Sequence, residues 1–122
     1  MFQFLRGIAL IAAIVTNSEA AFAAEVGTAD AMMPACRLAV GMQPNGPTNQ
    51  FTYQNSGICI GIIDGLSFQS PGICTPSGVT IAQGIRVVLK YIDDRPERLN
   101  ENFKTLVLEA LRAAWPCNTK SH

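Results

Sequence analysis

The segment from Cys74 to Cys117 contains two stretches in which apolar residues recur at helical spacing, separated by a turn around Pro96. The first stretch, residues 81–93, has an apolar face formed by Ile81, Ile85, Val88 and Ile92 and a polar face formed by Gln83, Arg86, Lys90 and Asp93. Two-sided stretches of this kind are typical of helices that bury one face. One cysteine precedes the first stretch and the other follows the second. The segment therefore predicts an antiparallel helical hairpin closed by a disulfide bond.

Local signals mark the ends of these two helices. Thr80 and Gln83 have the spacing of a capping box, in which both side chains satisfy free backbone N–H groups. Pro96 ends the first helix, because proline restricts the residue before it to extended backbone. Asn100 is the expected N-cap of the second helix, which ends before Pro116. The buried stripe of the second helix comprises Leu99, Phe103, Leu106, Val107, Ala110, Leu111 and Ala114.

The N-terminal half predicts two further helices joined by a loop. Residues 29–41 are helix-prone, with a first turn or a bend at Pro34. Residues 42–49, MQPNGPTN, form a loop, since their prolines and their Asn-Gly pair favour turns. Residues 50–69 read as a buried helix whose apolar side is formed by Phe51, Ile58, Ile62 and Leu66. The predicted fold is therefore all-α, a small bundle of four, or four to five, helices.

Two features of residues 50–69 suggest further roles. Gly57, Gly61 and Gly65 lie four residues apart and form a stripe that would let another helix approach closely, at some cost in helix propensity. Asp64 lies among apolar residues near the end of this helix. A functional carboxylate is one interpretation, but a capping or hydrogen-bonded structural role is the more frequent one for a lone Asp at such a place.

The first 23 residues have the features of a secretory signal peptide. One positive charge precedes an apolar run over residues 7–15, and Ala21-Phe22-Ala23 matches the small-x-small cleavage pattern. The alternative, an N-terminal membrane anchor, is disfavoured because the run is far shorter than the roughly 20 residues that span a bilayer. We expect cleavage after Ala23, export to the periplasm, and a single domain over residues 24–122 that is free of the membrane. Residues 24–28 are expected to be a short disordered lead.

Export would place the four cysteines in an oxidising compartment, where an even number in a small domain implies disulfide bonds. Because the predicted hairpin brings its two ends together, we expect Cys74 to pair with Cys117, which leaves Cys36 to pair with Cys59. A metal site is disfavoured, since no cysteines form a close pair and the only histidine is His122. We therefore predict no metal and no cofactor.

Composition excludes several classes of function. Without residues 1–23, the chain carries eight basic and eight acidic side chains, a balance that favours neither nucleic acid nor an anionic membrane surface as a partner. With one histidine, no Ser-His-Asp arrangement and all cysteines assigned to disulfides, the chain offers a poor set of candidate catalytic residues. We therefore expect a protein that is not an enzyme.

Several motifs, taken together and in order, resemble the Rap/Tai family. They are CIGIIDGL at 59–66, Cys74 with Pro76, GVT at 78–80, RVVLKY at 86–91, PERL at 96–99, Leu106-Val107, EAL at 109–111 and WPC at 115–117. The resemblance covers about residues 36–117. Because the matching positions are mainly cysteines, glycines, prolines and core residues, it supports the fold better than it supports the identity of a partner.

The resemblance implies an exported, all-helical immunity protein that binds and neutralises a peptidoglycan amidase effector of type VI secretion, and it suggests self-association as a homodimer. Recognition by the loop would involve Gln43, Asn45, Asn49 and Gln50, because loops on a rigid scaffold commonly carry binding residues. The same residues could equally form a plain connection. The alternative function is that of a small periplasmic helical protein with a structural or chaperone-like role and no toxin partner.

Overall fold

The computed structural model describes residues 27–44 and 48–118, and this part of the chain is built from helices. The elements are α2 (Ala29–Ala39), α3 (Gln50–Gln69), α4 (Ile81–Asp93), the 3-10 helix η1 (Pro96–Arg98) and α5 (Phe103–Ala114). The predicted all-α fold is confirmed, with four α-helices in the described ranges. The predicted signal peptide, residues 1–23, lies outside them. None of the helices described is long and apolar enough to cross a membrane.

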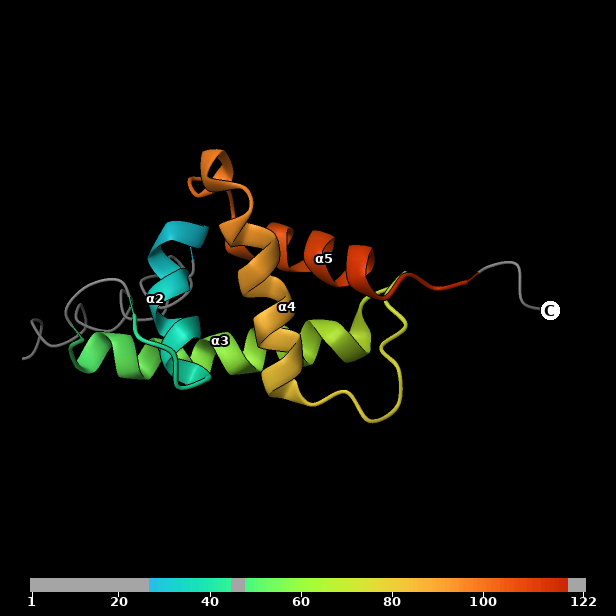
Figure 1. Ribbon diagram of the computed structural model, residues 1–122, viewed down its shortest axis with the longest axis horizontal. Coiled ribbons are helices and arrows are strands. Elements are labelled where there is room, and N and C mark those ends of the chain that lie inside the picture. The colour runs from blue at the N-terminus through green and yellow to red at the C-terminus, as the bar shows by residue number, and fades with distance from the viewer. Residues whose placement is uncertain (1–26, 45–47, 119–122) are drawn as a thin grey trace, which may run out of the picture.

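The helices form two pairs that cross each other. In Figure 1, α3 and α5 run along the long axis of the molecule, while α2 and α4 run across it. α4 and α5 contact each other, but α5 crosses the direction of α4, so the predicted antiparallel hairpin is wrong. The disulfide between Cys74 and Cys117 still forms, because Cys74 lies near the end of α5. Residues 75–80 then lead the chain back to the start of α4.

A single apolar core lies where the four helices meet. Its fully buried side chains include Phe103, Met32, Ile63, Ile85, Ile92, Leu106, Leu111, Val88 and Val107. Most of these belong to the apolar stripes predicted for α4 and α5. Ile81 and Ala114, at the outer ends of those stripes, are exposed. The core thus rests mainly on the two helices whose periodicity is clearest.

The start of α2 is held against the connection between α4 and α5. The Ala29 N–H donates to the Glu101 carbonyl at 3.0 Å, and the Phe103 N–H donates to the Gly27 carbonyl at 3.0 Å. Thr28 caps α2 and forms a β-bridge with Asn102. Residues 27 and 28 are therefore ordered, contrary to the expectation of a disordered lead, and residues 24–26 lie outside the described ranges. The N-cap of α5 is Asn102, not Asn100, and the Asn102 side chain accepts from the Thr105 N–H at 3.2 Å.

Helix α3 has the predicted bounds but a different orientation. Asn49 and Thr52 form a capping box at its start. Its buried residues are Asn55, Cys59 and Ile63, whereas Phe51, predicted to be buried, is half exposed. The glycine stripe does not receive a helix of the described chain, because no atom lies within 4 Å of the position a Cβ would take at Gly57, Gly61 or Gly65.

Two disulfide bonds connect the elements, Cys36–Cys59 and Cys74–Cys117, which are the two pairs expected from the sequence. The first joins α2 to α3 and is fully buried. The second lies at the surface, next to a β-bridge between Ile73 and Pro116. One bond therefore links the first two described helices, and the other links the segment before α4 to the segment after α5.

Candidate functional site

The four residues predicted to contact a partner have different surroundings. Gln43 is exposed after the end of α2, and Gln50 is exposed in the first turn of α3. Asn49 has a structural role, since its side-chain oxygen accepts from the Thr52 N–H at 3.1 Å. Asn45 lies outside the described residues. Of these four residues, Gln43 in the loop and Gln50 at the start of α3 are thus the ones left for recognition.

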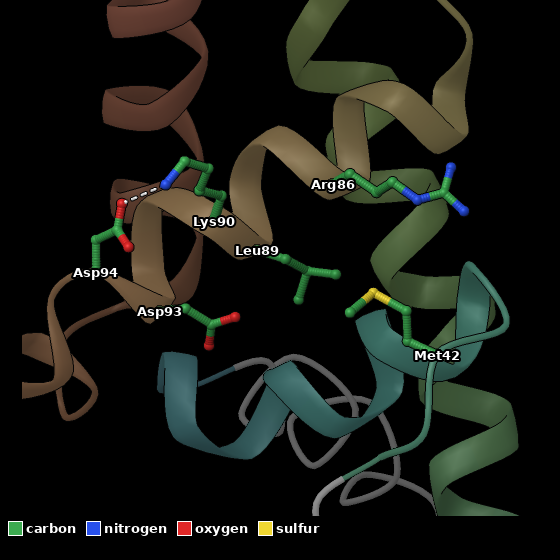
Figure 2. Close-up of a pocket in the computed structure, with 6 residues that line it drawn as sticks. All are labelled: Met42, Arg86, Leu89, Lys90, Asp93 and Asp94. Carbon is green, nitrogen blue, oxygen red and sulfur yellow. Dashed lines mark hydrogen bonds and ion pairs between the residues drawn. The ribbon is translucent and has the colours of Figure 1, made fainter.

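A hollow of about 570 Å³ lies beside this loop, between the end of α2 and the side of α4. Met42 and Leu89 point toward one another across it, as Figure 2 shows. Leu89 is buried and forms the floor, while the Met42 side chain is 40% exposed and forms one wall. The charged residues at the rim are Arg86, Lys90 and Asp93 of α4 and its C-cap Asp94. The hollow therefore combines a small apolar floor with a charged edge.

The charges at the rim are not equally available to a partner. Asp93 forms an ion pair with Arg37 of α2, and Asp94 accepts from the Lys90 ammonium group at 3.0 Å. Arg86 donates only to the Val40 carbonyl, at 3.4 Å, and has no carboxylate partner among the described residues. The guanidinium of Arg86 is therefore the charge at the rim that a partner can most readily use.

A second exposed surface runs along α3. Tyr53, Ile60 and Phe68 lie on its outer face and are 60%, 38% and 79% exposed. Gly57, Gly61 and Asp64 lie on the same face at helical spacing. Asp64 is exposed and has no hydrogen bond or ion pair within the described ranges, so the predicted structural role is not seen. Phe68 and Asp64 also line a smaller hollow, of about 100 Å³, at the start of α4.

The strongest electrostatic cluster joins η1 to α5. Arg98 donates two hydrogen bonds to Glu101 and two to Glu109, at 2.6–3.0 Å. Tyr91 adds a hydroxyl hydrogen bond to Glu109 at 3.0 Å. Hydrogen bonds from Arg98 lower the pKa of both glutamates and raise the pKa of Arg98 itself. These charges satisfy one another, which is typical of a structural ion-pair network.

No candidate metal site is found in residues 27–44 and 48–118. Groups of three or more His, Cys, Asp or Glu side chains that could hold a metal ion do not occur there. All four cysteines are in disulfides. The candidate binding surfaces of this part of the chain are the hollow with the adjoining loop and the outer face of α3.

A family model for Rap1a immunity proteins matches residues 28–117. The chain belongs to the Rap1a immunity protein family. The match begins at the N-cap of α2 and ends at Cys117, so it includes all four described helices and both disulfide bonds. Membership in this family implies an immunity function directed against a secreted effector. A search of curated proteins found no match, and neither did a search of solved structures.

The sequence did not reveal the hollow as a candidate site. Met42 was predicted as part of a loop, and Arg86 and Lys90 as part of a solvent-exposed helix face. Both interpretations are correct locally. The signal that could have drawn attention to the site is an exposed methionine at a helix end, because flexible methionines are frequent at binding surfaces.

Proposed function

We propose that this Rap1a family member is a periplasmic immunity protein that binds and inhibits a peptidoglycan amidase effector delivered by type VI secretion. The observation that carries the proposal is the family match over residues 28–117. The two disulfide bonds support the location, since such bonds form and persist in oxidising compartments. The amidase is the effector class that the resemblance to the Rap/Tai family implies.

Inhibition would occur by binding alone, without a reaction catalysed by this chain. In support, Arg98 is paired with Glu101 and Glu109 within the fold, and the cysteines of the described part are held in disulfide bonds. Gln43 and Gln50, with Asn45 between them in sequence, would then contact the effector. Residues 1–23 would direct export and be removed after Ala23, leaving a single domain over residues 24–122.

Self-association as a homodimer would use the outer face of α3. Tyr53, Ile60 and Phe68 expose apolar surface there, and Gly61 leaves room for a second helix to approach closely. Asp64 is the single charged residue on this face, so two copies could pack in antiparallel orientation with little charge repulsion. Replacing Gly61 by leucine would block the approach, and light scattering would then show a monomer where the native protein is a dimer.

The proposal is tested in cells that express an amidase effector found in the genetic neighbourhood of this protein, with the effector directed to the periplasm. We expect the full chain to restore growth and a variant lacking residues 1–23, which stays in the cytoplasm, to fail. Absence of rescue by the full chain, together with absence of a complex with the effector, would contradict immunity. That result would favour the alternative, a structural or chaperone-like helical protein without a toxin partner.

A further inference from the structure

We propose that the hollow between α2 and α4 receives a segment of the effector that carries an apolar side chain next to an acidic one. The proposal rests on the immunity function above and adds which surface of this chain is used and which chemistry it selects. This surface is formed only in the folded protein, because its lining combines residue 42 with residues between 86 and 94, which are far apart in the sequence.

The apolar part of the recognition comes from Met42 and Leu89. Their side chains face each other across the open space in Figure 2, so an inserted apolar side chain would contact both. Leu89 is held in place by the core, whereas the exposed and unbranched Met42 can adjust its rotamer to the shape of the guest. A volume of about 570 Å³ is large enough for one large side chain together with part of its backbone.

The acidic part of the recognition follows from the charges at the rim. Asp93 and Asp94 are each neutralised by a basic neighbour, while Arg86 has no carboxylate partner within the described ranges. A carboxylate of the effector would therefore meet a free guanidinium in which several N–H donors are available. A basic residue at the same place would be repelled by Arg86 and would have to compete with Arg37 for Asp93.

The hollow also adjoins the loop that is expected to contact the effector. Gln43 follows Met42 directly and is exposed. An effector segment seated in the hollow would thus touch the start of the loop as well, which makes the two surfaces one continuous recognition area. The face of α3 that carries Tyr53 and Phe68 is not part of this area, so it stays available for a second copy of the chain.

The test measures the dissociation constant between this protein and the neighbouring amidase effector by calorimetry, at physiological and at high salt. Arg86→Glu and Met42→Asp should each weaken binding at least about tenfold, as expected for residues at the centre of an interface. Arg86→Glu should also reduce the salt dependence of association. Arg112→Glu is the matched control, because Arg112 is likewise exposed and donates to one backbone carbonyl, that of Pro71, without lining the hollow.

The outcomes separate this inference from the function on which it rests. If the native protein binds the effector and both hollow variants bind within about threefold of it, as the control does, the hollow is not the recognition site. If the native protein does not bind the effector at all, the proposed function fails, and the partner named here fails with it. Circular dichroism of each variant checks the fold. Both substituted side chains are exposed, so the spectra should not change.

Discussion

Arg98 and Glu109 form a bidentate ion pair across eleven residues of sequence, with N–O distances of 2.6 and 3.0 Å. The same guanidinium also holds Glu101, so one arginine fixes the connection between α4 and α5 against the last helix. Because residues 99–103 in turn pair with the start of α2, this cluster supports the contact between the first and last helices of the described chain.

The ion pairs of Arg98 predict acid sensitivity. The pKa values of Glu101 and Glu109 are lowered below the ordinary value of 4.5, so their contribution to stability is present above that pH and is lost as pH falls through the lowered values. The free energy of unfolding should therefore decrease on acidification from pH 5 downward. Urea titrations between pH 7 and pH 3 measure this loss. The loss of stability should be smaller for the Glu109→Gln variant than for the native protein. Equal losses in the native protein and the variant would contradict a role of the Arg98–Glu109 ion pair in acid sensitivity.

The two disulfides should differ in their response to reducing agent. Cys36 and Cys59 are fully buried, whereas Cys74 is exposed, and a thiolate must reach a sulfur atom to open the bond. Under mild reduction of the native protein we expect Cys74 and Cys117 to be alkylated first. Peptide mapping by mass spectrometry would show it, and simultaneous labelling of all four cysteines would argue against the difference.

Removal of either bond should be costly. Loops of 23 and 43 residues correspond to about 3 and 4 kcal/mol in the chain-entropy model, a large part of the stability of a small domain. We therefore expect the fold to be stable only where both disulfide bonds can form.

Two glycines should respond in opposite directions to alanine. At Gly61, in the middle of a helix, a Cβ would meet no atom of the described chain within 4 Å, so Gly61→Ala should stabilise the monomeric fold by about 1 kcal/mol in protein dilute enough to be monomeric. Gly41 has φ +70°, a conformation that alanine adopts only with strain, so Gly41→Ala should destabilise it. Thermal unfolding measures both. A loss of stability for Gly61→Ala would indicate that this face is already covered in solution.

Asn49 should behave as a helix cap in a stability measurement. Since its side chain accepts from the Thr52 N–H, Asn49→Ala should reduce the free energy of unfolding by about 1 kcal/mol. Gln50→Ala, which changes an exposed neighbour, is the control and should have little effect on unfolding. Equal stability of the two variants would return Asn49 to the set of residues available for recognition.

The fold could be predicted where local signals and burial agree. For α4, the N-cap Thr80 and the apolar residues Ile85, Val88 and Ile92 point to one helix with one buried face, and the structure has both. For α5, the sequence predicted Asn100 as the N-cap. Asn102 caps the helix rather than Asn100, because residues 99–103 pair with residues 27–30, a tertiary contact that no local pattern contains.

The orientation of α3 shows the same limit. Ile58, Ile62 and Leu66 form a regular apolar row, but they are only partly buried, because the disulfide at Cys59 fixes which face of the helix meets α2. The row of glycines therefore faces outward. The shape of the hollow could not be predicted, since the hollow exists only when Met42 is brought next to Leu89 by the crossing of α2 and α4.

The central claim, immunity by binding, is tested most directly by titrating the oxidised protein into a peptidoglycan hydrolysis assay with the neighbouring amidase effector. We predict that hydrolysis falls to background at about one equivalent of this protein, in line with tight association at a specific interface. An amidase that hydrolyses peptidoglycan at an unchanged rate in the presence of excess oxidised protein would contradict the account.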